Sequence, residues 1–231
     1  MEPGRLLASG RDGDIFEYGP GLVLRRAKSG RVIEGEARTI AYAREHGYPV
    51  PEIHEIRSGG TEIVMERVEG PMMMDAMLKK PWLMGHFARA LADLHDRLHV
   101  IPAPDWLPDI DGGDRLVHLD LHPMNVMLAA SGPIVIDWTN ASRGDALTDV
   151  AVTMVLLTCP QMPGSRILNV AATPARSFLA RTFSARYKGR ALDEKIAFAA
   201  RLKALDKNLS AEEIAACERY GDRARARSGA I

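Results

Sequence analysis

The chain has 231 residues and a mass of 25.3 kDa, with 30 Lys and Arg against 30 Asp and Glu, so its formal net charge is zero. A neutral chain lacks the surplus of cations with which general nucleic-acid binders displace counterions, so we expect no nucleic-acid partner. No segment approaches the ~20 apolar residues that span a bilayer, and the two cysteines lie far apart, so we expect a cytoplasmic protein without a membrane partner. Oligomeric state does not follow from the sequence.

The first part of the chain is predicted to form a small, mostly antiparallel sheet with one helix. Short apolar runs separated by glycine-containing turns predict strands at residues 5–9, 14–18, 22–26, 52–57 and 61–67. Between the third and fourth of these, residues 32–46 have a helical pattern that ends at Gly47, and Pro49 and Pro51 then favour extended chain.

The rest of the chain is predicted to be mainly helical. Amphipathic or apolar patterns predict helices at residues 83–98, 146–157, 166–186, 193–205 and 211–225. Short apolar strands are expected at residues 126–128 and 134–136. We therefore predict a first lobe over residues 1–66, a hinge over 67–70 and a second lobe over 71–231.

The most informative stretch reads HLDLHPMN from His118 to Asn125, and Asp137 follows after an apolar run. A carboxylate, an amide and a second carboxylate at this spacing are typical of phosphoryl transfer, in which one Asp orients the attacking hydroxyl and the other two groups hold magnesium. We predict Asp120 as the catalytic base. Asn125 and Asp137 are predicted to bind Mg²⁺, which prefers hard oxygen ligands.

Arg25 lies in the strand predicted over residues 22–26, at the position where kinases carry a phosphate-binding lysine. We predict that it contacts the nucleotide phosphates and pairs with a glutamate of the following helix, first Glu36 and second Glu34. Gly10 and Gly13 would let backbone N–H groups approach phosphates. A surface arginine and an ordinary glycine-containing hairpin are the alternatives.

Two acidic features near the motif allow more than one interpretation. Asp145 is predicted to cap the next helix, and Asp149 is predicted to tie that helix to the catalytic loop. The acidic stretch over residues 101–114 either attracts a cationic substrate or forms a solvated loop.

These residues resemble the aminoglycoside phosphotransferase and choline kinase group, the phosphotransferase enzyme family. The match is H-x-D-x-H-P-x-N over residues 118–125, I-D-W over 136–138, and the G-D…D pattern of Gly144, Asp145 and Asp149. Residues 36–51 and 64–70 resemble the helix with its following strand and the hinge of the same group.

The resemblance implies an α+β, bilobal protein-kinase-like fold, with a small antiparallel-sheet N-lobe carrying one helix and a mainly helical C-lobe. It implies ATP and Mg²⁺ as cofactors and a hydroxyl-bearing small molecule as the acceptor: an aminoglycoside, an amino-alcohol or a sugar-like compound. The backbone expected to contact adenine is that of Met65, Glu66, Arg67 and Val68.

The sequence also departs from the group's pattern. Arg25 replaces the usual lysine, Leu119 stands where glycine is common, and the region after Asp149 is short. That region carries a net positive charge, which does not suit a polycationic aminoglycoside. A nucleotide-binding pseudokinase or regulatory module is therefore the alternative function, and a protein kinase is disfavoured because D-F-G and A-P-E are missing.

Overall fold

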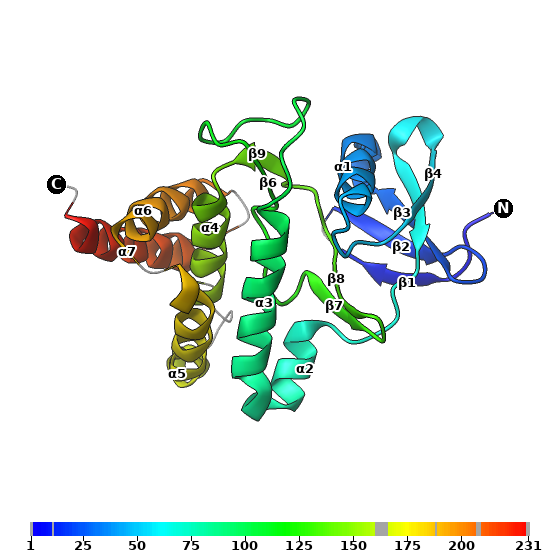
Figure 1. The fold of residues 1–231 in the computed structure, drawn as a ribbon. Helices are drawn as coiled ribbons and strands as arrows, with labels where there is room; N and C mark the ends of the chain where they lie inside the picture. The colour runs from blue at the N-terminus through cyan, green and yellow to red at the C-terminus, as the bar shows by residue number, and fades with distance from the viewer. Residues whose placement is uncertain (1, 11, 160–165, 188, 207–208, 230–231) are drawn as a thin grey trace. The chain divides into compact units, whose positions relative to one another are not determined.

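The computed structural model describes residues 2–10, 12–159, 166–187, 189–206 and 209–229 (Figure 1). The chain divides into two compact units. Unit 1 combines Met1–Asp75 with Met124–Ala141, and unit 2 combines Ala76–Pro123 with Ser142–Ile231. The predicted lobes and the hinge at residues 67–70 stay a prediction. No helix in the described ranges is long and apolar enough to cross a membrane.

Unit 1 contains a five-stranded antiparallel sheet in the order β1-β2-β3-β5-β4. The strands are β1 Leu6–Ser9, β2 Gly13–Glu17, β3 Leu22–Ala27, β4 Ile53–Arg57 and β5 Glu62–Glu66. Helix α1, Glu34–Glu45, packs against this sheet (Figure 1). Period-two alternation in β3 places Val23 and Ala27 in a core with Ala37 of α1, while Leu24 packs with Tyr18 in a second cluster.

A second hairpin completes unit 1, from β7 Val126–Ala129 and β8 Gly132–Val135. The N–H of Leu128 donates to the carbonyl of Pro71 at 2.9 Å, and that of Val135 donates to Pro49 at 2.8 Å. Gly70 has a φ of 146°, and a Cβ placed there would lie 2.1 Å from the carbonyl oxygen of Leu128. Glycine is thus required where the chain passes β7.

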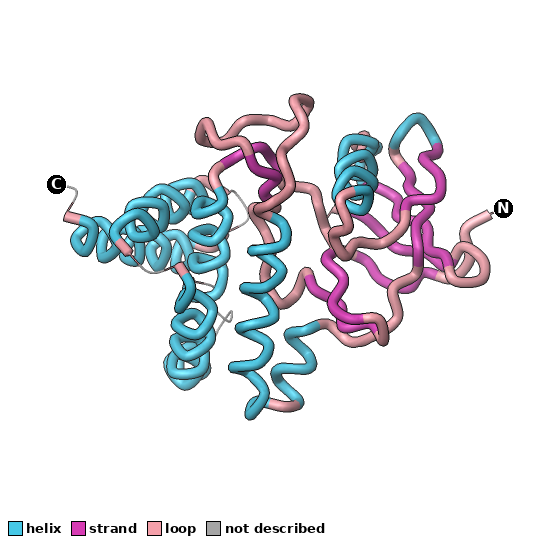
Figure 2. The backbone as a smooth tube through the Cα atoms, viewed as in Figure 1, coloured by secondary structure: helices cyan, strands magenta, loops and turns pink. Residues whose placement is uncertain are grey.

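Unit 2 is mainly helical, as the cyan tube segments of Figure 2 show. Its helices are α3 Met84–Leu98, α4 Ala146–Thr158, α5 Arg166–Phe183, α6 Arg190–Ala204 and α7 Ala211–Ser228. The predicted amphipathic face of α3 is buried, and α6 packs along α7 and α4. Strand β6, Arg115–Val117, pairs with β9, Ser142–Gly144.

Three elements were not predicted: helix α2 and the paired strands β6 and β9. Helix α2, Met73–Lys79, begins in unit 1 and ends in unit 2, and its methionine-rich sequence carries no clear helical periodicity. Strand β9 has only three residues, none of them apolar, and it forms through pairing with β6. Short 3₁₀ helices occur at Lys28–Gly30, Ser58–Gly60, Pro81–Leu83 and Ser184–Arg186.

Gly13 and Gly35 give a matched pair of glycine substitutions in unit 1. A Cβ at Gly13 would lie 2.7 Å from the carbonyl oxygen of Arg26, whereas one at Gly35 in α1 meets nothing within 4 Å. We expect Gly13→Ala to lower the free energy of unfolding by about 1–3 kcal/mol through overpacking. Gly35→Ala should raise it by about 0.5–1 kcal/mol by reducing backbone entropy in the unfolded state. Urea denaturation of both variants checks this, and equal effects would contradict it.

Candidate active site

Unit 1 contains a cavity of about 600 Å³, a size typical of small-molecule sites. Its apolar lining comes from the sheet, from helix α1, from connecting loops and from the second hairpin with the residue after it: Ile15, Val23, Ile40, Pro51, Met65, Met72, Met127 and Ile136. Its polar and glycine lining comprises Ser9, Gly10, Asp12, Gly13, Arg25, Glu66, Arg67, Asn125 and Asp137. An apolar lining together with cationic and oxygen-bearing groups suits a ligand with an aromatic and an anionic part.

Arg25 of β3 and Glu36 of α1 form a buried, hydrogen-bonded ion pair. A second guanidinium nitrogen of Arg25 donates to the hydroxyl of Thr139 at 3.3 Å, and that hydroxyl donates to Glu36 at 3.1 Å. The same nitrogen lies 3.7 Å from Oδ1 of Asp137. The network thus links the sheet, the helix and the segment after β8, and it uses Glu36 as the helix phase predicted.

Glu36 is the electrostatically costly member of this network. Burial raises the pKa of its carboxyl above the ordinary value, and the charge of Arg25 opposes that shift. The nearby negative charge of Asp137 raises the pKa further. The arginine is therefore needed to keep Glu36 ionised.

Asn125 and Asp137 lie at the two sides of the β7–β8 hairpin and both line the cavity. The N–H of Ile136 donates to the backbone carbonyl of Asn125 at 3.0 Å, which fixes the two segments side by side. Asp137 has a φ of 62°, an unusual backbone conformation for an aspartate that such functional sites commonly tolerate. Its Oδ1 is buried and has no hydrogen-bond partner within the described ranges. A buried carboxylate oxygen in a cavity that an amide residue also lines suits a hard divalent cation.

The loop between β1 and β2 is held by its own hydrogen bonds. The N–H of Gly10 donates to the carbonyl of Gly13 at 2.9 Å, so this donor is already used. The ammonium of Lys28 donates to the carbonyl of Gly10 at 2.7 Å and to Ser9 Oγ at 3.1 Å. These contacts hold the loop, which lines the cavity, and they place Gly13 where its backbone lies close to the carbonyl oxygen of Arg26.

The segment after β5 presents its backbone along the cavity. The N–H of Glu66 donates to Glu52 at 2.8 Å, and the N–H of Arg67 donates to Gly21 at 2.9 Å. Val68 lines the same cavity, and within the described part of the chain its backbone N–H has no acceptor. Val68 is therefore the backbone donor of this segment that a ligand can use.

In unit 2, the loop that follows β6 is anchored by Asp149 of α4. Leu119 has a φ of 58°, and its N–H donates to Oδ1 of Asp149 at 2.7 Å. Burial alone would raise the pKa of Asp149, but His95 and His99 outweigh burial and hold it well below the ordinary range. The predicted link between α4 and the loop that carries Asp120 is confirmed, as is the capping role of Asp145, which accepts from the N–H of Leu147 at 2.8 Å.

Asp120 lies on this anchored loop and has two basic neighbours in unit 2. The ammonium of Lys203, from α6, lies 3.4 Å from Oδ1, and Nε2 of His122 lies 3.8 Å from Oδ2. The carboxyl group is 22% exposed and the lysine side chain 14%. Asp120 is therefore a carboxylate that remains accessible and is flanked by positive or protonatable groups.

The acidic stretch over residues 101–114 is largely committed to internal contacts. Asp109 pairs with Arg143 at 2.5 Å, and Asp111 pairs with Lys195 at 2.8 Å. These partners hold the pKa of Asp109 below its ordinary value, with the hydrogen bond from Arg143 as the main cause. The stretch is therefore better described as a stabilised loop than as an attractor for cations.

The structure thus brings most of the predicted residues together around one cavity in unit 1, and it places Asp120 on the anchored loop of unit 2. Thr139 and Lys203 are polar neighbours of these residues that the sequence interpretation missed. Thr139 lies two residues after Asp137, but this spacing alone does not predict a contact with Arg25 and Glu36. Lys203 carried no sequence signal, because 83 residues separate it from Asp120.

Residues 97–168 match the model of the Phosphotransferase enzyme family. No curated protein sequence matches this chain. The aminoglycoside phosphotransferase APH(4)-Ia, solved as a ternary complex with ADP and hygromycin B, is 18% identical with a TM-score of 0.65, over 98% of this chain and 94% of that chain.

Two further solved structures are similar. A choline/ethanolamine kinase family protein from Mesorhizobium loti is 14% identical with a TM-score of 0.52, over 97% of this chain and 87% of that chain. The streptomycin–ATP complex of APH(2'')-IIa is 16% identical with a TM-score of 0.58, over 87% of this chain and 84% of that chain. The predicted α+β, kinase-like fold and the family resemblance are confirmed.

Proposed function

We propose that this protein is a Mg²⁺-dependent O-phosphotransferase that moves the γ-phosphoryl group of ATP to a hydroxyl group of a small molecule. The observation that carries the proposal is the unit 1 cavity, which Arg25, Asn125 and Asp137 line together with apolar side chains. The family match over residues 97–168 supports the same reaction class.

The cavity residues have distinct roles in this proposal. Arg25, held by Glu36, contacts the nucleotide phosphates, and the turn containing Gly10 and Gly13 covers them. Asn125 and Asp137 hold the magnesium ion, which offsets phosphate charge when bound. The segment Met65, Glu66, Arg67 and Val68 contacts the adenine, with the N–H of Val68 as the donor.

Asp120 orients the acceptor. Asn125 lies five positions after it in the chain, a stretch that spans at most about 18 Å when fully extended. As the acceptor oxygen bonds to the γ-phosphorus, its proton passes to the Asp120 carboxylate. The bond from that phosphorus to the β–γ bridging oxygen breaks, and ADP leaves. Lys203 keeps the carboxylate in one orientation.

Turnover tests the function directly. The experiment measures ADP release from Mg²⁺-ATP across a panel of amino-alcohols, sugars and aminoglycosides. We expect at least one acceptor to be phosphorylated, with polycationic aminoglycosides disfavoured because Lys203 adds positive charge beside Asp120. Tight ATP binding with no turnover on any acceptor would favour a nucleotide-binding module, and no ATP binding would contradict both functions.

The adenine contact gives a second, sharper test. Val68→Pro removes the N–H that we assign to the base, so the Kd for Mg²⁺-ATP should rise about 3- to 10-fold, the effect of one net hydrogen bond. Val68→Ala keeps the N–H and serves as the matched control, with a smaller change expected. Isothermal titration calorimetry measures both. Equal affinities of the two variants would show that the N–H of Val68 makes no contact with the nucleotide.

A further inference from the structure

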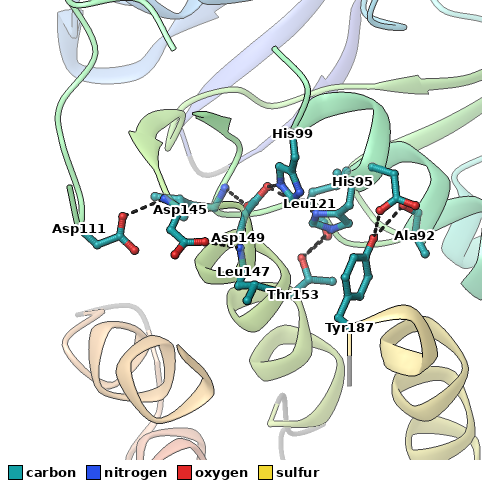
Figure 3. Close-up of polar contacts among 12 residues, drawn as sticks. Ala92, His95, His99, Asp111, Leu121, Asp145, Leu147, Asp149, Thr153 and Tyr187 are labelled. Carbon is teal, nitrogen blue, oxygen red and sulfur yellow. Dashed lines mark hydrogen bonds and ion pairs between the residues drawn. The ribbon is translucent and has the colours of Figure 1, made fainter. Parts of the chain in front are cut away.

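A buried cluster of two histidines and one aspartate lies in unit 2, on residues that do not line the unit 1 cavity. His95 lies in the last turn of α3, His99 is the C-cap residue directly after that helix, and Asp149 comes from α4 (Figure 3). One nitrogen or oxygen from each side chain lies within 4.8 Å of the others. His95 and Asp149 are fully buried, and the side chain of His99 is 9% exposed.

The hydrogen bonds around His95 settle where its ring proton lies. The hydroxyl of Thr153 donates its only proton to the carbonyl of Leu121 at 2.8 Å. At 3.0 Å from Nε2 of His95, the same hydroxyl oxygen must therefore accept a proton from that ring nitrogen (Figure 3). Nδ1 is then left with a lone pair in the neutral ring.

That lone pair faces a carboxylate. Nδ1 of His95 lies 3.5 Å from Oδ2 of Asp149 and has no hydrogen-bond partner within the described ranges. Burial lowers the pKa of His95, and the negative charge of Asp149 opposes this shift. Two electron-rich atoms thus face each other in a buried site, an arrangement that a cation between them would stabilise.

We propose that His95 Nδ1, His99 Nε2 and Asp149 Oδ2 bind a divalent transition-metal ion, with Zn²⁺ as the best-suited ion. Two imidazoles and one carboxylate are a common zinc donor set, and histidines four residues apart on a helix present their rings to one ion. The distances from Asp149 Oδ2, 2.9 Å to His99 and 3.5 Å to His95, bracket the separation of neighbouring ligands in a tetrahedral site, about 3.3 Å for ligand bonds near 2.0 Å.

The surrounding contacts fit this assignment. Thr153 holds the second nitrogen of His95, as outer partners of metal-bound histidines commonly do. Oδ1 of Asp149 remains with the N–H of Leu119, so binding through Oδ2 leaves the catalytic-loop anchor intact. The slightly exposed edge of His99 offers a route for a water molecule as the fourth ligand. The proposal does not depend on the proposed phosphotransferase activity.

Co²⁺ is the spectroscopic probe for this site. The full chain is stripped with EDTA, freed of chelator and titrated with Co²⁺, and we expect one equivalent to produce the visible absorption of tetrahedral cobalt. Titration with Zn²⁺ should abolish this absorption. At free Zn²⁺ near 100 times its Kd, Tm should rise by roughly 5–10 °C. Absence of the cobalt bands, or more than one equivalent bound with no saturation, would overturn the proposal.

Two variants locate the ion. His99→Gln removes one ligand and should weaken Zn²⁺ binding at least tenfold, whereas His86→Gln, at an exposed position of the same helix, should bind as the wild type does. Equal binding by both variants would contradict the site.

The cobalt spectrum of the wild-type protein shows which residues bind the ion even if His99→Gln does not fold. Thiolate-to-cobalt charge transfer in the near ultraviolet would instead assign the ion to Cys159 or Cys217. ¹⁵N NMR at pH 8 with excess Zn²⁺ reports the protonation of the His95 ring. Protons on both ring nitrogens would show that a proton, and not the metal ion, lies between His95 Nδ1 and Asp149 Oδ2, and would overturn the proposal.

Discussion

Asp120→Ala should lower kcat by about 100- to 10,000-fold, because it removes the group that orients the acceptor hydroxyl and takes its proton. The Kd for Mg²⁺-ATP should stay unchanged, because Asp120 is not among the residues that line the unit 1 cavity. ADP release with an acceptor found in the panel measures the first quantity, and calorimetry measures the second.

The matched control is Asp114→Ala. Asp114 carries a carboxyl group that is 83% exposed and pairs with Arg115 at the surface, so we expect wild-type turnover from this variant. If Asp120→Ala keeps activity within twofold of the wild type, the assignment of the base is wrong. If its ATP affinity falls as far as its turnover, the residue acts on the nucleotide and not on the acceptor.

Arg25→Met should lower the free energy of unfolding by about 3–5 kcal/mol, because it leaves the carboxylate of Glu36 buried without its cation. The double variant Arg25→Met/Glu36→Met should recover most of this loss, since no buried charge then remains unpaired. Arg5→Met is the control in the same unit. The side chain of Arg5 is 75% exposed and pairs with Glu17, whose side chain is 36% exposed, so its loss should cost less than about 1 kcal/mol.

The Arg25→Met deficit should also depend on pH in a defined direction. The pKa of Glu36 is already raised by burial, and removing Arg25 raises it further. The folded protein then holds a proton that the unfolded chain releases near pH 4.3, so stability falls as pH rises through the folded pKa. Urea unfolding should therefore show a small deficit at pH 4 and the full deficit at pH 8. A deficit that is constant over this range would contradict the buried, ionised Glu36.

Most elements were predictable because their signals are local. Glycine-containing turns separate the strands of the sheet, and Gly47 with two prolines ends α1 within a residue or two of its predicted end. Strand β9 was not predictable, because its three residues form a strand only by pairing with β6. Helix α2 was not predicted for another reason: its methionine-rich sequence has no periodic polar face that would indicate a helix.

In the candidate site, too, the features with a local sequence signal were predictable and those that depend on tertiary structure were not. Glu36 could be predicted from helix phase, and Asn125 and Asp137 from motif spacing. The contact of Thr139 with Arg25 and Glu36 depends on the left-handed backbone at Asp137, which sequence does not reveal. The pairing of Asp120 with Lys203 depends on how α6 packs in unit 2, a property of the whole helical assembly.

The discontinuous make-up of unit 1 has a consequence for biosynthesis. Its second hairpin is hydrogen-bonded to Pro49 and Pro71, yet it is encoded only after residues 76–123 of unit 2. A chain emerging from the ribosome therefore cannot close this unit when residue 75 has appeared. The cavity, whose lining includes Asn125 and Asp137, is completed only after Asp137 has been translated, when more than half of the polypeptide has been synthesised.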